Sequence, residues 1–347
     1  MQFPGLGKPP LGVIFDSDFG NHIDSALALA LLYGLDGKTE ARVVSLSVSK
    51  SSLKAAAFSD AVARFYAGAV SGAFGSFSRT LPVGLATDGK SPQDTPILSA
   101  VLSKKTAEGA PAYPNSINHL NDTAEVAALI RNSFTGQQDQ NCVVILAGPA
   151  TNLVSVFPLP GVKNLIAVKA RSLFVAAGAY PDGAPDQHIK SDIAAAKKLF
   201  AEWPTEIIAV GREIGEAMRY PASSIEKDFA WTSNHPVADA YRAFQPMPYD
   251  AAAPSMAAVL QAVRGKENYF KLSEPGRIQV LDDGRTRFTP AADGKHRYLI
   301  IDPAQKEKII QTYTEIASLK PQPRMPRFRS QQKQADPAKP PEAKKQP

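Results

Sequence analysis

Three aspartates fall within nine consecutive positions near the start of the chain, where an apolar run ends. Asp16, Asp18 and Asp24 belong to the segment GVIFDSDFGNHIDSALALALLYGL. Carboxylates that are held close together repel one another, so such a cluster is costly unless a cation or a bound substrate stabilises it. These residue types at this spacing therefore indicate a site for a cation, for a ligand, or for both.

The elements that must position these aspartates are predicted from the hydrophobic pattern. Residues 11–18 are apolar up to their acidic end and predict a buried strand, and residues 23–35 have the length and leucine/alanine content of a buried helix. Further strands are predicted at 41–49, 81–86, 141–148 and the start of 205–215, and residues 164–180 contain strand-like runs. Helices are predicted at 52–68, 123–134, 150–157, 192–203 and 303–319. Residues 276–290 are predicted to form a hairpin. Thr123 is the predicted N-cap of its helix.

The alternation of strands with helices of ten or more residues predicts an α/β fold. We expect an open, mainly parallel, Rossmann-like sheet with helices on both faces. In such sheets ligands bind beyond the carboxyl ends of the strands. Asp16 and Asp18 follow one predicted strand and the segment AGPATN follows another, so both are expected at this edge.

The domain organisation is predicted from composition. We expect a Pro/Gly-rich lead-in at 1–10, one domain at 11–319, and a disordered, basic Pro/Gln/Lys-rich tail at 320–347. From residue 321 onward the tail holds seven Lys/Arg against two Asp/Glu, which accounts for five of the six formal positive charges. The remainder is nearly neutral, which argues against nucleic acid as a partner.

The cellular compartment is constrained only weakly. Cys142 is the single cysteine, which excludes an intrachain disulfide. No stretch is long and apolar enough to cross a membrane, so no membrane partner is expected. The first residues lack the basic and apolar regions of a signal peptide. We expect a cytoplasmic protein, or a periplasmic or secreted one if a leader has been removed.

The segment DSDFGNHIDSALAL resembles the signature D-x-D-x-G-N-D-x-D-D-A-L-A-L of a longer bacterial branch of the inosine–uridine-preferring nucleoside hydrolase family. Three later segments are similar to that family in the same order. VVILAGPATNL resembles its G-P-x-T-N-L segment, DQHIKSDIAAAKKLF its E-F-N-x-x-x-D-P-E-A-A-K segment, and YDAAAPSMAAVLQAVRG sits where the family has H-D-P or W-D before a helix. The resemblance covers roughly residues 11–318.

This resemblance implies a nucleoside-hydrolase-like fold and a glycosidase-class hydrolase that acts in purine or pyrimidine salvage. A Ca²⁺-bound water would attack the anomeric carbon of a ribonucleoside and cleave its N-glycosidic bond. The chemistry suits the residues, because Ca²⁺ prefers oxygen ligands and a carboxylate can accept a proton from its water. The implied partner is a nucleoside or another ribosyl compound, and the family suggests a homodimer or homotetramer.

The resemblance also assigns roles to the metal site. Asp18 matches the aspartate that serves as metal ligand and general base, and Asp16 matches one that supports the site by hydrogen bonding. Ala147 matches the residue whose backbone carbonyl ligates the metal. Asp250 matches the distal metal-ligand aspartate, and Ser25 stands at the position of a further ligating aspartate.

The substrate-binding residues implied by the resemblance include Asp24 and Asp186, which match residues that bind ribose hydroxyls. His188 and Tyr249 also belong to this set, but each departs from the family's residue type. The departures from the family pattern within the site are Ser25, His22, His188, Tyr249 and Lys50. Ser25 brings no charge and Lys50 adds a positive one, so Ca²⁺ is expected to bind weakly or not at all.

Two other functions remain open at this point. One is a non-catalytic relative that binds a ribosyl compound or another polyol through a degenerate metal site. The other is an interaction protein that uses the basic tail at 320–347. In a purely structural interpretation, Asp16 and Asp18 form only an Asx turn and a helix cap.

Overall fold

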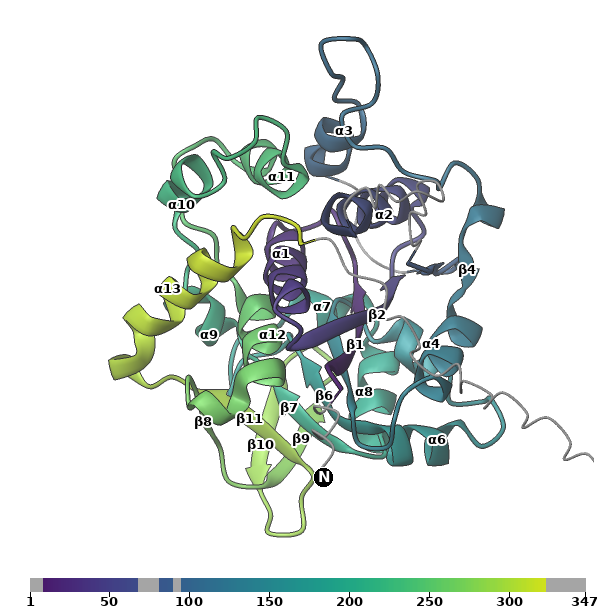
Figure 1. The fold of residues 1–347 in the computed structure, drawn as a ribbon. Coiled ribbons are helices and arrows are strands. Elements are labelled where there is room, and N and C mark those ends of the chain that lie inside the picture. Colours follow the sequence, from purple (N-terminus) through teal and green to yellow (C-terminus); the bar gives the residue numbers. More distant parts are fainter. Residues whose placement is uncertain (1–8, 68–80, 90–94, 323–347) are drawn as a thin grey trace, which may run out of the picture.

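Among the described residues, eleven strands form one sheet with helices on both sides (Figure 1). The computed structural model describes residues 9–67, 81–89 and 95–322. The predicted lead-in up to residue 8 and the predicted tail beyond residue 322 lie outside this range. The strands are β1 (Leu11–Ser17), β2 (Ala41–Val48), β3 (Val83–Leu85), β4 (Ala124–Glu125), β5 (Cys142–Ala147), β6 (Ala170–Val175), β7 (Glu206–Ala209), β8 (Lys271–Leu272), β9 (Gly276–Val280), β10 (Thr286–Pro290) and β11 (His296–Ile300).

The sheet is mainly parallel, as predicted. Its strand order is β10-β9-β11-β7-β6-β5-β1-β2-β3-β4, and β8 pairs with β11 outside this path. Every pairing from β11 to β4 is parallel, whereas β9 and β10 form the predicted antiparallel hairpin. β1 lies at the centre, and all seven of its residues are buried, as expected of a parallel strand that is covered on both faces.

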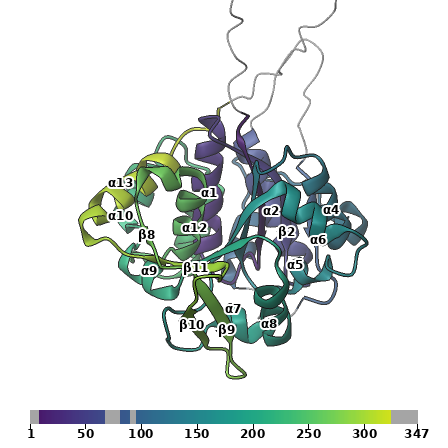
Figure 2. The same cartoon turned by 90° about the horizontal axis from the view of Figure 1, so that it is seen from below.

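The helices cover both faces of this sheet. They are α1 (Asp24–Gly37), α2 (Leu53–Ala67), α3 (Pro96–Leu102), α4 (Val126–Thr135), α5 (Thr151–Ser155), α6 (Val162–Lys169), α7 (Gln187–Ser191), α8 (Ile193–Glu202), α9 (Arg212–Ala217), α10 (Ala222–Lys227), α11 (Pro236–Phe244), α12 (Pro254–Arg264) and α13 (Lys306–Ala317). Figure 2 shows α1 and α12 on one side of the sheet and α4 and α6 on the other. α1 is buried almost all round, because it packs against α12, α13 and β2.

The alternation of side chains along β1 decides which core each residue joins. Val13 and Phe15 point into the core that includes α1, whereas Ile14 points into the core that includes α4, α5 and α6. By the same alternation, Asp16 lies on the Ile14 side of the sheet and Ser17 on the α1 side. The two residues at the end of β1 therefore meet different partners.

One helix lies where none was predicted. Strand-like runs were predicted within 164–180 and β6 confirms one of them, but residues 162–169 form α6. Val162 and Ile166, the buried residues of this segment, are four positions apart, which is the spacing of one helix face. The strand β6 starts only at Ala170.

The predicted N-cap Thr123 is also wrong. Its hydroxyl donates to the carbonyl of Leu120 at 2.6 Å, in the turn before β4. Glu125 caps α4 instead, since its carboxylate accepts the amides of Ala127 at 2.9 Å and Ala128 at 2.6 Å.

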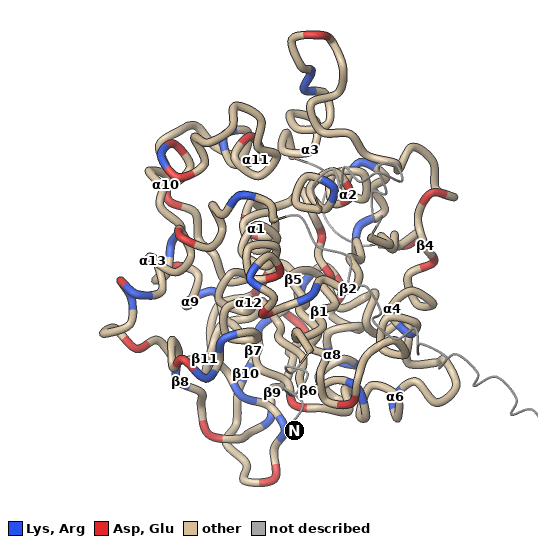
Figure 3. The backbone as a smooth tube through the Cα atoms, in the orientation of Figure 1, with Lys and Arg blue, Asp and Glu red and all other residues tan. Residues whose placement is uncertain are grey.

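Two features bear on possible partners over the part of the chain that the structure describes: the apolar character of the helices and the distribution of charged residues. No helix there combines the length and apolar character that crossing a membrane requires. Lys/Arg and Asp/Glu residues are interspersed over its helices and loops (Figure 3).

Candidate active site

Asp16 is fully buried at the end of β1 and is held by neutral donors. Ser47 of β2, its partner in the β1–β2 register, and Asn152 of α5 both donate to Oδ2, the latter at 2.7 Å. Asp16 Oδ1 has no hydrogen-bond partner among the described residues. Burial raises the pKa of Asp16 to about 7, against the lowering effect of the two donors, and the charge of Asp18 adds to the rise. This carboxyl group is therefore partly protonated at neutral pH.

Asp18 lies in the turn that follows β1, where both of its carboxylate oxygens face nitrogen groups. Asn21 Nδ2 donates to Oδ2 at 2.7 Å, and Nε2 of His188 lies 3.6 Å from Oδ1. The Asn21 side chain is oriented in turn by the buried Lys50, whose Nζ donates to Asn21 Oδ1 at 2.6 Å. Gly20 has a φ of +96° in this turn, a conformation that glycine adopts without strain.

Asp24 is the first residue of α1 and joins it to the start of α12. Its two carboxylate oxygens accept the amide of Ser255 at 2.9 and 3.2 Å. Burial raises the pKa of Asp24 to about 6, although the hydrogen bonds from Ser255 lower it. Asp24 thus holds together two helices that pack against each other on the α1 side of the sheet.

Ser25 belongs to a neutral hydrogen-bonded set on the α1 side of β1. Its Oγ lies 2.6 Å from Oγ of Ser17, and Ser17 Oγ donates to the carbonyl of Ala147 at 3.0 Å. The contact arises because β1 and β5 pair with Ser17 opposite Ala147. The structure therefore brings the predicted Ser25 and Ala147 together through a residue that the sequence analysis did not single out.

Asp186 and His188 reach the site from the segment that follows β6. Asp186 caps α7 by accepting the amides of His188 at 2.9 Å and Ile189 at 3.2 Å. His188 Nδ1 lies 3.1 Å from the carbonyl of Ala176, which can only accept, so Nδ1 carries a hydrogen. Burial lowers the pKa of His188, but the charges of Asp18, Asp186 and Asp24 and the hydrogen bond to the Ala176 carbonyl raise it, and the net shift is upward.

Asp250 lies in the loop between α11 and α12 and bonds to the start of α10. Its side chain is exposed, and Oδ1 accepts the amide of Ala222 at 2.9 Å, at the first turn of α10. α12 begins at Pro254, four residues further along the chain.

Aromatic rings extend from His188 toward α11. The rings of His188 and His22 have centroids 6.3 Å apart, those of His22 and Phe244 6.2 Å, and those of Phe244 and Tyr249 6.2 Å. Tyr249 also stacks on Tyr241 at 4.4 Å and donates its hydroxyl to the Tyr241 carbonyl at 2.6 Å. Burial and the charge of His188 lower the pKa of His22. The rings of His22, Phe244 and Tyr249 thus form a row of flat surfaces that leads away from His188, the neighbour of Asp18.

The oxygen donors of this site do not fit a Ca²⁺ ion. Such an ion takes six to eight oxygens, mainly from carboxylates. The Ser25 hydroxyl already bonds to Ser17, and the Ala147 carbonyl already accepts from Ser17. The exposed Asp250 carboxylate accepts the Ala222 amide of α10. In the ranges that the structure describes, no three His, Cys, Asp or Glu side chains are arranged to hold a metal ion.

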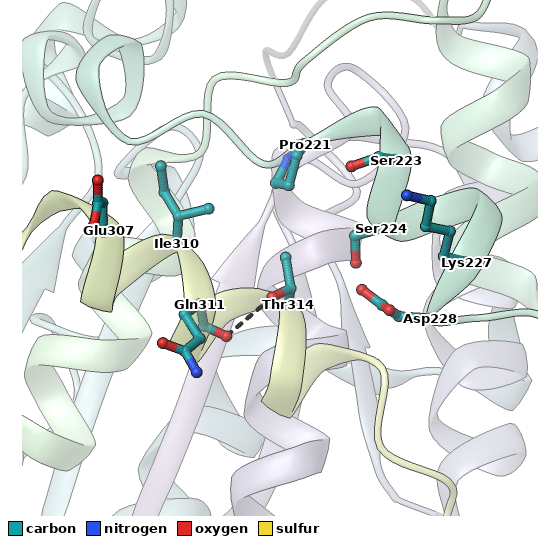
Figure 4. Close-up of a pocket in the computed structure, with 9 residues that line it drawn as sticks. All are labelled: Pro221, Ser223, Ser224, Lys227, Asp228, Glu307, Ile310, Gln311 and Thr314. Carbon is teal, nitrogen blue, oxygen red and sulfur yellow. Dashed lines mark hydrogen bonds between the residues drawn. The ribbon is translucent and has the colours of Figure 1, made fainter.

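A surface hollow of about 480 Å³ lies elsewhere, between α10 and α13 (Figure 4). Lys227, Asp228 and Glu307 at its rim are exposed, and the hydrogen bond from Thr314 Oγ1 to the Gln311 carbonyl is internal to α13. These groups do not converge on one point. The buried aspartates at the carboxyl edge of the sheet are the stronger candidate, because charged groups are buried there at a cost.

Comparisons with known proteins match this geometry at the level of the fold. No family profile and no curated protein matches the sequence. Among solved structures, the chain is similar to the inosine–uridine-preferring nucleoside hydrolase from Bacillus anthracis, with a TM-score of 0.62 and 15% identity over 89% of this chain and 99% of that one. It is similar to an inosine–guanosine nucleoside hydrolase with a TM-score of 0.66 and 14% identity, over 88% and 98% of the two chains.

A third similar structure is the type III effector protein XopQ complexed with adenosine diphosphate ribose. It has a TM-score of 0.60 and 14% identity, and the match covers 90% of this chain and 94% of that one. Identities this low establish the fold alone. They confirm the predicted nucleoside-hydrolase-like α/β sheet over nearly the whole of these proteins.

Proposed function

We propose that the site around Asp18 binds the ribose of a nucleoside-like compound and hydrolyses its N-glycosidic bond. The observation that carries this proposal is the Asp18–His188 contact of 3.6 Å at the carboxyl edge of the sheet, in a fold shared with nucleoside hydrolases. Two of the similar structures are hydrolases named for inosine, uridine or guanosine, and a third is an effector protein complexed with adenosine diphosphate ribose. All of these compounds contain a ribosyl group.

Each residue has a role in the proposed reaction. Asp18 accepts a proton from water, the water oxygen bonds to the anomeric carbon, and the N-glycosidic bond breaks with its electron pair passing to the base nitrogen, which takes a proton from solvent. Asn21 and His188 fix the orientation of the Asp18 carboxylate. His188 and Asp186 bind ribose hydroxyls, and Asp24 orders the α1–α12 junction beside them.

The aromatic rings that lead away from His188 suit the departing base. His22, Phe244 and Tyr249 form an array of flat, neutral surfaces, and a purine or pyrimidine ring stacks favourably on such surfaces. A sugar without an attached planar group would leave these rings unused. We therefore infer a nucleoside-like ligand rather than a free polyol.

One observation favours a second function, which is ribosyl binding without hydrolysis. Both carboxylate oxygens of Asp18 already face nitrogen groups, Asn21 Nδ2 at 2.7 Å from Oδ2 and His188 Nε2 at 3.6 Å from Oδ1, so less of the carboxylate is open to an attacking water. A site of this kind can hold a ribosyl ligand while cleaving it slowly or not at all.

A nucleoside panel separates the two functions. Inosine, guanosine, uridine and cytidine are incubated with the purified full chain, with and without chelator, and release of free base is followed by chromatography. Binding of the same compounds is measured in parallel by calorimetry. Base release supports hydrolysis, binding without release supports the second function, and neither binding nor release contradicts both.

A further inference from the structure

Lys50 is a buried cation next to the aspartates. It comes two residues after β2, and its side chain is 3% exposed. Its Nζ donates to Asn21 Oδ1 at 2.6 Å, and Asn21 Nδ2 donates to Asp18 Oδ2 at 2.7 Å. One amide side chain therefore links the ammonium group to the carboxylate, donating on one side and accepting on the other.

The segment directly after β3 contacts the backbone around Lys50. Ala86 donates its amide to the carbonyl of Val48 at 3.0 Å, and Gly89 donates its amide to Ser51 Oγ at 2.8 Å. A Cβ on Gly89 would lie only 2.7 Å from Cα of Lys50, so the two backbones are in direct contact. The position of the lysine is thus built into the fold.

Burial of a lysine is costly, and so is burial of several aspartates. An ammonium group that leaves water loses several kcal/mol of hydration free energy unless opposite charge and hydrogen bonds replace it. The carboxylate of Asp18, which is 3% exposed, carries a similar cost. The chain Lys50–Asn21–Asp18 pairs the buried ammonium group with this carboxylate through one shared amide, which reduces both costs.

We infer that the ammonium group of Lys50 is the resident cation of this site, linked through Asn21 to Asp18, and that the site works without a Ca²⁺ ion. The part that concerns the cation stands on the contacts above. Only its consequence, that a ribosyl ligand binds without metal, rests on the proposed function.

The test compares stability in chelator and in Ca²⁺, using the full chain after metal removal. We expect Ca²⁺ to leave the melting temperature of the wild-type protein unchanged, because a ligand stabilises only a protein that binds it. Calorimetric titration with Ca²⁺ should likewise give no binding heat. A rise in melting temperature of about 2 °C or more that Asp18→Ala abolishes would overturn the inference.

Variants at Lys50 test its charge directly. Lys50→Met should lower the melting temperature by on the order of 5–10 °C, because it removes the buried ammonium group that is linked through Asn21 to the Asp18 carboxylate. The matched control is Lys54→Met, an exposed lysine four residues later in the chain, which should cost no more than about 1–2 °C. Equal effects of the two substitutions would contradict the inference. If Lys50→Met fails to fold, the Ca²⁺ titration of the wild-type protein still decides.

A double variant tests whether lysine and metal exclude each other. Lys50→Met combined with Ser25→Asp removes the internal cation and restores a carboxylate, so Ca²⁺ should now raise the melting temperature. If Ca²⁺ still does not raise the melting temperature of the double variant, the inference that Lys50 takes the place of a metal ion is contradicted. These readouts do not involve a nucleoside, so a chain that cleaves no nucleoside yet ignores Ca²⁺ would refute the proposed function and leave this inference intact.

Discussion

The fold accommodates two sets of buried polar side chains in different ways, the aspartates at the end of β1 and the histidine His235. Asp16 and Asp18 at the end of β1 are buried together with polar partners, which are Ser47 and Asn152 for Asp16 and Asn21 and His188 for Asp18. On the α1 side of the sheet, His235 is 1% exposed and is surrounded by rings. The centroids of Phe65 and Phe229 lie 4.6 Å from that of His235.

The histidine loses its charge, whereas the aspartates are given partners. Burial lowers the pKa of His235 to about 3, so the ring is neutral at physiological pH. Its Nδ1 accepts the amide of Ala238 at 3.4 Å, and its Nε2 lies 3.3 Å from the hydroxyl of Tyr66. A neutral, hydrogen-bonded histidine in a ring cluster is a structural residue. Several carboxyl groups buried together at the carboxyl edge of a sheet mark a candidate functional site.

The largest effect is expected at Asp18, where the comparison predicts function. Asp18→Asn keeps the shape of the side chain and removes the base, so base release from the preferred nucleoside should fall by roughly 100-fold or more. Asp139→Asn, at an exposed aspartate paired with Lys169, is the matched control and should retain the wild-type rate. Equal rates for Asp18→Asn and wild type would show that the activity arises elsewhere.

The next effect concerns acid stability at the histidine cluster. The folded pKa of His235 is below its unfolded value, so the unfolded chain binds the proton first and stability is lost as pH falls from about 6.5 toward 3. His235→Phe should flatten the dependence of the urea midpoint on pH in this range, relative to the exposed control His119→Gln. Burial also lowers the pKa of His296, to about 4, so some slope will remain in both proteins. Parallel curves for His235→Phe and wild type would contradict the assignment.

Asp16 should show the opposite pH dependence. Its folded pKa of about 7 exceeds the ordinary value of 3.8, so the folded protein holds a proton that the unfolded chain has released. Stability is therefore lost as pH rises from about 4 to 7. Asp16→Asn removes this loss and should be more stable than wild type at pH 8 but not at pH 4, as measured by urea unfolding. An advantage that does not grow with pH would show that Asp16 is ionised in the folded protein. Asp24, whose pKa burial raises to about 6, contributes a slope of the same sign in both proteins.

The smallest effect is expected at the neutral set around Ser25. Ser25→Ala removes the hydrogen bond to Ser17 and should cost about 1 kcal/mol of unfolding free energy. Ser17 still donates to the carbonyl of Ala147, so no buried carbonyl loses its partner. The measurement is urea unfolding at constant pH, and Ser318→Ala, at a half-buried serine that bonds within the last turn of α13, is the control. A much larger loss at Ser25 would mean that its hydroxyl supports more than this contact.

Several elements of the fold could be predicted because their signals are local. β1 is a continuous apolar run that ends in acidic residues, and α1 is a long leucine/alanine segment. The helix α6 was not predicted, because a short apolar segment fits either period. Glu125 replaced Thr123 as the cap of α4 because residues 124–125 pair with β3 and delay the start of the helix.

The sequence by itself determined the mainly parallel sheet, because alternating strands and helices admit few other arrangements. It also determined that Asp16 and Asp18 lie at the end of a strand. Only the tertiary structure decided their partners. The β1–β2 register brings Ser47 to Asp16, and the turn after β2 brings Lys50 to Asn21, which lies 29 residues earlier in the chain. Strand register and loop path depend on packing between distant segments, so the sequence revealed the charges of this site and the fold decided how they are compensated.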